Sequence, residues 1–288
     1  MGKAVIAIIK GGLGNQLFIY SAARAFALDK GRLLFLDQER GYTHDKYERS
    51  YRLNRFPIHA ETMPEEWRVA PTLKHPRHKL IRAWNKFLPR NWRSYIAHRW
   101  HLPPGQLLDL NPGRIRVTLN GYWSDEEYFV KHSGLIRKEL AVPPPKDERN
   151  LKLGDEISSA NTVFIHARRV NYPTLISADY YREALKSLRQ RLADPEFVVF
   201  SDDPAWTKEN IDFGDSPVRW VEHNADDELA DLWLMTRCRH AVIANSSFSW
   251  WGAWLGGDVS SGRIIFAPEN PKWGIPPANG WFGIPFKM

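Results

Sequence analysis

The sequence contains little cysteine and no long hydrophobic run. Its 288 residues include one cysteine, Cys238, which excludes internal disulfides and favours a reducing compartment. No segment approaches the roughly 20 apolar residues that a membrane-spanning helix needs. The opening MGKAVIAIIKGG has too short an apolar run for a secretory signal. We therefore expect a cytoplasmic protein that does not span a membrane.

The sequence also lacks the motifs that most often bind metal ions or phosphate. It contains no D-x-D, no Cys/His cluster with metal-ligand spacing and no G-K-[ST] of a P-loop. We therefore expect no metal and no other cofactor. Any phosphate of a ligand would have to be neutralised by arginine side chains and by helix N-termini.

Acidic residues are absent from residues 67–101, which contain nine Lys/Arg and account for the net charge of +7 of the whole chain. The apolar residues of this segment fall on one face of a predicted helix: Leu80, Ile81, Trp84, Phe87 and Leu88. A basic aromatic helix of this kind suits an anionic membrane surface, to which the protein would bind peripherally. The alternative is a solvated helix packed on its own domain. We expect no nucleic-acid partner.

Strand patterns alternate with helical patterns along most of the chain. A buried strand at residues 3–9, a glycine break, a helical pattern and a strand at 32–36 make one βαβ unit. The proline-rich residues 141–150 are typical of a linker. After it, strands are expected at residues 162–167, 196–200, 218–221, 241–244 and 263–266, and helices at 178–192, 226–237 and 248–255. The predicted fold class is α/β, with two Rossmann-like domains at residues 1–150 and 151–288.

Ligands of open parallel sheets bind outside the carboxyl ends of the strands. Four loops follow predicted strands at that position: residues 11–16, 167–172, 201–203 and 245–247. The last one, Asn245-Ser246-Ser247, is polar and uncharged and opens a helix at Phe248. Its backbone N–H groups and hydroxyls suit a phosphate. Alternatively, Ser247 is only a helix cap.

Two adjacent arginines follow the strand at residues 162–167. A desolvated, unpaired cation is strongly disfavoured, so Arg168 and Arg169 indicate an anionic partner. Arginine is also shaped for bidentate contact with phosphate. Because successive side chains of an extended chain point to opposite sides, only one of the two should face the ligand. An internal Arg–Asp ion pair is the alternative.

The motif GGLGNQ at residues 11–16 matches a dinucleotide fingerprint only in part. Gly12 and Gly14 fit G-x-G-x-x-G, but Leu17 occupies the third glycine position. Asp37 lies where a ribose-binding acid would stand, which keeps a nicotinamide-dependent enzyme as an alternative. Asn15 and Gln16 instead offer neutral amide donors at the start of a helix.

Five motifs stand in the order and spacing of the bacterial α-1,2-fucosyltransferases of glycosyltransferase family 11: GGLGNQLFIYSAA, GYWSDEEYF, HARRVNY, FSDDPAW and DLWLMTRCRHAVIANSSFSWWGAWL. The chain resembles that family from about residue 6 to residue 268. The resemblance implies a glycosyltransferase-B-type fold, in which two Rossmann-like domains face each other across a cleft. It also implies metal-independent, inverting transfer of L-fucose from GDP-β-L-fucose to the 2-hydroxyl of a terminal β-galactoside. The acceptor would be a surface glycan (O-antigen), carried on a lipid.

The resemblance also implies roles for individual residues. Arg168 would hold the β-phosphate and stabilise GDP as it leaves. His166 and Asp231 would lie near the guanine, and Ser247 and Phe248 at the phosphate and nucleoside end. The other donor-binding positions would be Gly12, Gly14, Asn15, Gln16, Asp202, Asn245 and Ser246. The three tryptophans of FSWWGAWL have the spacing of core residues.

One motif departs from the family pattern. Members usually read H-x-R-R-G-D-Y, whereas this chain has Val170 and Asn171 in place of the glycine and the aspartate. If that aspartate acts as the base or orients Arg168, Asn171 cannot do so as an anion. Asp37 and Asp125 are acceptor-side candidates for the base. A binding adaptor that uses residues 67–101 and has a degenerate catalytic site is the remaining alternative.

Overall fold

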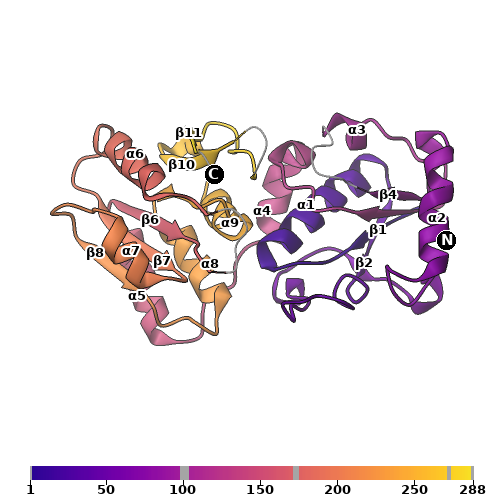
Figure 1. The fold of residues 1–288 in the computed structure, drawn as a ribbon, viewed down its shortest axis with the longest axis horizontal. Coiled ribbons are helices and arrows are strands. Elements are labelled where there is room, and N and C mark those ends of the chain that lie inside the picture. The colour runs from indigo at the N-terminus through magenta and orange to yellow at the C-terminus, as the bar shows by residue number, and fades with distance from the viewer. Residues whose placement is uncertain (1, 98–103, 171–174, 271–273, 287–288) are drawn as a thin grey trace. The chain divides into compact units, whose positions relative to one another are not determined.

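The computed structural model describes residues 2–97, 104–170, 175–270 and 274–286. The chain folds as two compact units, residues 1–141 and 142–288 (Figure 1). The division falls before the expected boundary at 150/151, because residues 148–150, expected in the linker, begin helix α5 (Glu148–Ser158). The Asp147 carboxylate caps this helix by accepting from the Asn150 N–H at 2.8 Å.

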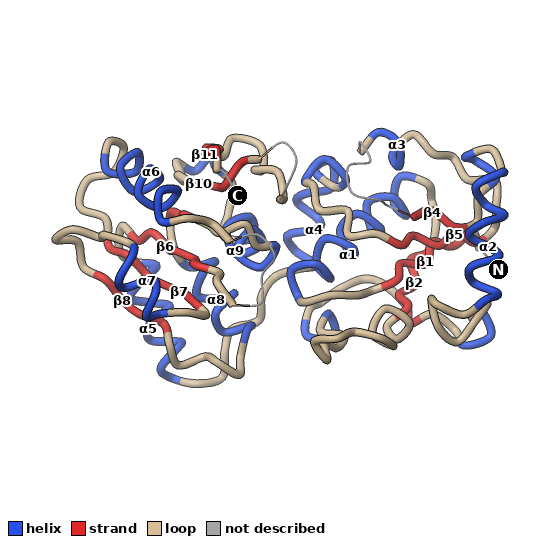
Figure 2. The backbone as a smooth tube through the Cα atoms, viewed as in Figure 1, coloured by secondary structure: helices blue, strands red, loops and turns tan. Residues whose placement is uncertain are grey.

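Unit 1, residues 1–141, is built around a parallel five-stranded sheet of order β3-β2-β1-β5-β4 (Figure 2). Its central strand β1 (Ala4–Ile8) has five buried apolar residues, as expected of a strand covered on both faces. Helix α1 (Leu13–Asp29) joins β1 to β2 (Leu33–Asp37), which confirms the predicted βαβ unit. The other regular elements are β3 (Glu61–Thr62), β4 (Tyr95–Ala97), β5 (Arg116–Asn120), α2 (Pro76–Phe87), α3 (Gly105–Leu108) and α4 (Ser133–Glu139).

The middle of unit 1 is more regular than its sequence suggests. Strands β3, β4 and β5 are short and escape a pattern search, because two to five residues give too little periodicity. They form because β3 pairs with the free edge of β2, β5 with the free edge of β1, and β4 in turn with β5. The connections are 3₁₀ turns: η1 (Leu53–Arg55), η2 (Glu65–Trp67), η3 (Arg90–Trp92), η4 (Glu126–Tyr128) and η5 (Val130–His132).

Unit 2, residues 142–288, contains a parallel six-stranded sheet of order β11-β10-β9-β6-β7-β8. Strand β6 has β7 on one side and β9 on the other, so the direction of winding reverses there. The strands are β6 (Thr162–Ala167), β7 (Glu196–Ser201), β8 (Val218–Val221), β9 (His240–Val242), β10 (Ile265–Glu269) and β11 (Phe282–Pro285). The helices are α5, α6 (Ala178–Arg189), α7 (Pro204–Asn210), α8 (Glu228–Arg237), α9 (Ser247–Leu255) and the 3₁₀ turn η6 (Val259–Ser261).

The tryptophans of α9 form part of the core of unit 2. Trp250, Trp251 and Trp254 are each at most 1% exposed, and their rings contact one another at centroid distances of 5.1–6.1 Å. On the same helix, Gly252 lies so close to α8 that a Cβ there would be 2.8 Å from Met235. The structural role predicted for these tryptophans is confirmed. In the described part of the chain, no helix has both the length and the apolar character needed to cross a bilayer.

Candidate functional site

The reversal of winding at β6 brings several polar loops together at one edge of the unit 2 sheet. Because β6 pairs in parallel with both β7 and β9, their carboxyl ends lie side by side. The loops that follow carry Arg168 after β6, Asp202 after β7 and Asn245 after β9. These are three of the positions expected from the sequence.

The two arginines after β6 point into different surroundings. The Arg169 guanidinium stacks 3.7 Å from the centre of the Trp206 ring, and its Nη1 donates to the Ile176 carbonyl at 2.6 Å. The Arg168 side chain remains 41% exposed, and its Nη1 lies 3.0 Å from Asp202 Oδ2. The two side chains therefore differ in their partners, as the alternation of an extended chain predicts, and that only Arg168 faces a ligand stays a prediction. The alternative of an Arg–Asp ion pair also holds, but the pair is at the surface.

Asp202 supports the arginine loop. Its Oδ1 accepts from the Arg169 backbone N–H at 2.7 Å, and its Oδ2 accepts from the Val170 N–H at 3.0 Å as well as contacting Arg168. Both carboxylate oxygens are thus engaged by the loop. The structure gives Asp202 a positioning role, where the sequence suggested contact with the donor.

His166, the penultimate residue of β6, is an uncharged ring at the same edge. The side chain is 7% exposed, and its Nδ1 is buried without a hydrogen-bond partner in the described chain. Burial, assisted by the charge of Arg168, lowers the pKa of His166 to about 3. Its ring centroid lies 6.2 Å from that of Phe248 on α9. The two rings form an aromatic pair next to the arginine loop.

The first turn of α9 supplies backbone donors. Ser246 is its N-cap, and the Ser246 Oγ accepts from the Phe248 N–H at 3.3 Å. The interpretation that Ser247 is only a cap is therefore wrong, because Ser246 fills that role. Ser247 and Phe248 are partly exposed, whereas Asn245 is 6% exposed. Gly274 keeps Asn245 in place, since a Cβ at residue 274 would lie 2.7 Å from Asn245 Oδ1.

Asp231 on α8 belongs to a polar network that the sequence analysis missed. Asn224 Nδ2 donates to Asp231 Oδ1 at 2.9 Å, and Asn150 Nδ2 donates to Asn224 Oδ1 at 2.8 Å. Burial is the main reason why the pKa of Asp231 is raised to about 7, and Asp227 adds to the rise. The strand-end rule could have found Asn224, because the polar segment EHN (residues 222–224) follows β8.

In unit 1 the loop between β1 and α1 is shaped by its glycines. Gly11 has a φ of +78°, and a Cβ there would lie 2.9 Å from the Asn15 side chain. Gly12 is the N-cap of α1, Gly14 is buried in its first turn, and Asn15 is partly exposed. Gly12 and Asn15 therefore present accessible polar atoms at this edge of the unit 1 sheet.

Gln16 has a different place from the one expected. The side chain is fully buried: Nε2 donates to the carbonyls of Gly11 and Ser50 at 3.0 and 2.8 Å, and Oε1 accepts from the Arg52 N–H at 2.9 Å. All of its polar capacity joins the glycine loop to residues 50–52. Gln16 shapes the site and does not line it.

The acceptor-side candidates differ in accessibility. Asp37 is 1% exposed, pairs with Arg40 Nε at 2.5 Å and accepts from the Arg40 N–H at 3.1 Å. Its proposed role as base or ribose ligand is wrong, because no accessible oxygen remains. Asp125 is partly exposed and caps η4 by accepting from the Glu127 N–H, and burial raises its pKa. Asn171 lies outside the described residues.

Among the residues that the structure describes, no group of three or more His, Cys, Asp or Glu is placed to hold a metal ion. The charged groups described above at the unit 2 edge include Arg168 and Asp202, with Asp231 on α8 and the partial positive charge at the N-terminus of α9. This arrangement can receive an anionic group beside a flat aromatic one.

Comparison with known proteins gives consistent matches over most of the chain. Residues 4–272 match the model of glycosyl transferase family 11. The chain is 32% identical to an alpha-1,2-colitosyltransferase of Escherichia coli, over 87% of both chains. It is 28% identical to the O-antigen biosynthesis glycosyltransferase WbnK of Escherichia coli, over 92% of this chain and 93% of WbnK. It is 27% identical to the galactoside alpha-(1,2)-fucosyltransferase 2 of mouse, over 96% of this chain and 76% of that protein.

One solved structure resembles the fold over nearly the whole chain. A mutant of FUT1 from Arabidopsis thaliana, in complex with GDP, matches with a TM-score of 0.54 at 14% sequence identity, over 95% of this chain and 73% of FUT1. The predicted fold class, α/β with two Rossmann-like, glycosyltransferase-B-type domains, is confirmed.

Proposed function

Because the chain belongs to glycosyl transferase family 11, we propose that it transfers L-fucose from GDP-β-L-fucose to the 2-hydroxyl of a terminal β-galactoside. The names of its relatives support the α-1,2 linkage and a galactoside acceptor. The observation that carries the donor assignment is the partly exposed Arg168 in the loop after β6. Strand β6 lies next to β9, and the loop after β9 leads into the N-terminus of α9. An arginine and a helix N-terminus are two groups that bind a diphosphate without metal.

The donor would lie along the carboxyl edge of the unit 2 sheet. Arg168 would hold the β-phosphate, and the N–H groups of Ser247 and Phe248 would donate to the phosphates. Phe248, which is partly exposed and whose ring is tilted against the buried His166 ring, offers an aromatic face for the nucleoside. Asp231 would accept from the N–H groups of guanine, because a carboxylate matches two adjacent donors.

The reaction needs a leaving group stabilised on one side and a nucleophile on the other. As the bond between the anomeric carbon and the phosphate oxygen breaks, negative charge develops on GDP, and Arg168 is placed to stabilise it. The galactoside hydroxyl attacks from the opposite face, which inverts the configuration, and loses its proton. Asp125 remains a candidate for the base, because it is partly exposed and because burial raises its pKa, which makes the carboxylate a stronger base.

A second donor deserves a direct comparison. The relative with 32% identity is a colitosyltransferase, and colitose is 3-deoxyfucose. The two activities differ by one hydroxyl. A site that hydrogen-bonds this hydroxyl would reject the deoxy sugar strongly, whereas an apolar site would discriminate only weakly.

The cellular role that we propose is synthesis of a bacterial surface glycan. The name of WbnK supports an O-antigen, whose repeating unit is assembled on a lipid carrier at the cytoplasmic face of the inner membrane. The enzyme would therefore be cytoplasmic and would meet a lipid-linked acceptor.

The decisive experiment is a transfer assay with purified protein, GDP-fucose or GDP-colitose, and a small panel of β-galactosides. We expect a fucosylated product whose linkage is α-1,2 by NMR. A product from GDP-colitose alone would assign the second donor. Absence of transfer from both donors, with GDP binding also absent by calorimetry, would contradict the proposed function.

A further inference from the structure

Helix α2 of unit 1 packs against its own domain through polar side chains. The buried residues of α2 are His78 and Asn85. The His78 ring meets the Tyr95 ring edge-on at 5.0 Å, and Asn85 Oδ1 accepts from the N–H groups of Ser94 and Tyr95 at 2.8 and 3.2 Å. An amphipathic helix usually buries its apolar face. Here the face toward β4 is the polar one.

The apolar residues of α2 are consequently at the surface. Leu80, Trp84 and Phe87 are 69%, 69% and 83% exposed. They border a groove of about 1020 Å³ whose other walls include Trp67 and Ile115. Trp92, one turn beyond α2, is also 63% exposed. Four large apolar side chains thus lie exposed on α2 and the turn that follows it.

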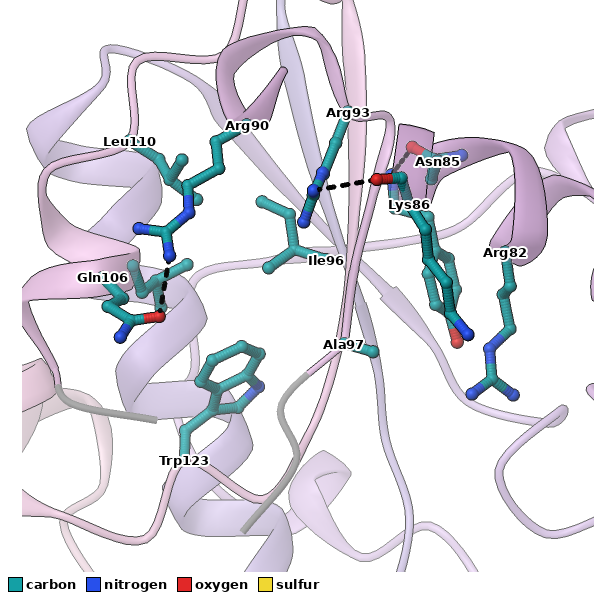
Figure 3. Close-up of a pocket in the computed structure, with 12 residues that line it drawn as sticks. Arg82, Asn85, Lys86, Arg90, Arg93, Ile96, Ala97, Gln106, Leu110 and Trp123 are labelled. Atoms are coloured by element: carbon teal, nitrogen blue, oxygen red, sulfur yellow. Dashed lines mark hydrogen bonds between the residues drawn. The ribbon is translucent and has the colours of Figure 1, made fainter. Parts of the chain in front are cut away.

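A cationic pocket lies next to this apolar surface. It has a volume of about 310 Å³ and shares Asn85 and Tyr95 with the groove. Figure 3 shows Arg90 and Gln106 on one side of the pocket and Arg82 on the other. Four cations line it, and none of its described lining residues is acidic: Arg82, Lys86, Arg90 and Arg93. A pocket of this composition suits an anion such as a phosphate group.

We propose that α2 and the segment after it, residues 76–97, form a docking surface for an anionic lipid bilayer. The exposed Leu80, Trp84 and Phe87 enter the interfacial layer, where aromatic and aliphatic side chains are stabilised. The cations of the pocket contact the lipid phosphates. A helix of this length extends about 18 Å, so it can contact several headgroups at once.

Charge and exposure together favour a bilayer over other anionic partners. Residues 76–97 contain six Lys/Arg and no Asp or Glu, so the surface complements a negative one. Nucleic acid would use the cations but would leave the exposed Trp84 and Phe87 in water. Only a partner that is both anionic and apolar satisfies both parts of the surface.

Vesicle co-sedimentation of the whole protein tests this proposal. We expect binding to phosphatidylcholine vesicles that contain about 30% phosphatidylglycerol, little binding to pure phosphatidylcholine, and weaker binding at high salt. Equal binding to both vesicle types would overturn the proposal. So would absence of binding, or binding to a duplex oligonucleotide instead of vesicles.

Two double variants separate the cationic and the apolar contributions. Arg82→Glu with Lys86→Glu should weaken vesicle binding at least about a hundredfold, because each cation near an anionic leaflet contributes about a factor of five and reversal counts twice. Trp84→Ser with Phe87→Ser should weaken vesicle binding to a similar degree, but the salt dependence of the remaining binding should stay as in the wild type. All four side chains are exposed, so the melting temperature should change little.

Matched controls are available elsewhere on the chain. Lys138→Glu with Lys152→Glu reverses two exposed cations, and Val130→Ser with Leu135→Ser removes two exposed apolar side chains. The pair at 130 and 135 lies at or beside α4, on the other side of unit 1 from α2 (Figure 1). Both controls should bind vesicles like the wild type. A loss as large as that of the α2 variants would indicate a general effect of charge or hydrophobicity and would contradict the proposal.

The proposal of a membrane-binding surface and the proposed sugar-transfer activity can be contradicted independently of each other. The α2 variants should retain transfer to a soluble galactoside, since none of the four residues has a role in the reaction proposed above. A folded variant that loses both vesicle binding and soluble transfer would place this surface in the acceptor site. Vesicle binding itself requires no transfer, so a negative transfer assay leaves this test intact.

Discussion

At the scale of single residues, neighbours in the sequence have separate roles in the structure. Arg169 is held by Trp206 and by a backbone carbonyl, so it belongs to the framework of unit 2. Arg168 is partly exposed and is oriented by Asp202. The chemistry proposed for this site therefore depends on the guanidinium of Arg168 alone. Removal of that group should impair the reaction and leave the framework of unit 2 intact.

Substitution of Arg168 tests that dependence. Loss of a charge-assisted contact to phosphate should weaken donor binding by about 1.5–3 kcal/mol. Because the same group would stabilise the leaving diphosphate, kcat should fall by a further factor of about 10²–10³. Arg168→Lys should be nearly as damaging as Arg168→Ala, because an ammonium cannot replace a bidentate fork. The measurement is kcat and donor KM.

Arg182→Lys is the matched control, since Arg182 is an exposed residue of α6 that pairs with Asp179. It should leave both constants unchanged. Activity of Arg168→Lys within a few-fold of wild type would remove Arg168 from the proposed role.

The pKa of Asp231 predicts a pH dependence of donor binding. In the free protein this carboxyl titrates near pH 7, whereas a carboxylate that accepts from guanine must be ionised. Affinity for GDP-fucose should therefore rise with pH and level off above about pH 8, being roughly tenfold weaker at pH 6 than at pH 8. GDP-fucose is the suitable ligand, because its diphosphate has no ionisation in this range. Calorimetry without acceptor gives the affinity.

Asp231→Asn should bind more weakly and with little slope between pH 6 and pH 8. If this variant keeps the slope of the wild type, another group titrates. Asn224→Ala is a useful companion, because Asn224 donates to Asp231 and lowers its pKa. Its removal should move the midpoint to higher pH.

The resemblance to the family motif leads us to expect an aspartate where this chain has Asn171. Exchange of this residue distinguishes two roles for that position. Asn171→Asp should raise kcat with little change in donor KM if the missing group is a base. A change confined to donor KM would indicate that the residue orients Arg168. Unchanged or lower kcat and KM would direct the search for the base to Asp125. A steady-state comparison with wild type, at saturating acceptor, gives the answer.

At the scale of elements, the packing of α9 against α8 positions the turn that we propose to bind phosphate. Gly252 allows the close approach, because a Cβ there would lie 2.8 Å from Met235 Cβ and Sδ. We expect Gly252→Ala to lower the free energy of unfolding by about 1–3 kcal/mol, although alanine is the better helix former. The displaced α9 should also weaken GDP binding.

Gly134→Ala on α4 is the matched control, since nothing lies within 4 Å of its Cβ position. It should be neutral or stabilising by up to about 1 kcal/mol. Thermal denaturation of both variants measures the contrast. Equal melting temperatures would mean that α8 and α9 adjust without cost.

At the scale of the whole molecule, we expect transfer to need no metal ion. The proposed donor site supplies Arg168 and the N-terminus of α9, which together offset the charge of the leaving diphosphate. The transfer rate should stay within about twofold when the purified enzyme is treated with EDTA. A rate that collapses and returns with Mn²⁺ or Mg²⁺ would replace this donor site with a metal-centred one.

Much of the framework could be predicted from the sequence. Runs such as AVIAI in β1 and TVFIHA in β6 are apolar enough to be recognised as buried strands, and alternation with helices predicts parallel sheets. Parallel sheets in turn put the strand-end loops at one edge. For that reason Arg168, Asn245 and Ser246 could be located in the sequence before their surroundings were known.

The sequence by itself determined the two α/β sheets, the polar loops at the strand ends and the buried tryptophans of α9. Only the tertiary structure decided which polar side chains remain accessible. Asp37 and Gln16 are polar residues at strand and helix ends, yet one pairs with Arg40 and the other with the backbone around Ser50. The periodicity of a sequence shows which positions are apolar. It does not show which hydrogen-bond partner a polar side chain finds, because that depends on how the chain packs. The orientation of α2 has the same origin. Its apolar face is evident in the sequence, but that face is exposed because Asn85, on the opposite side, bonds to the backbone at Ser94.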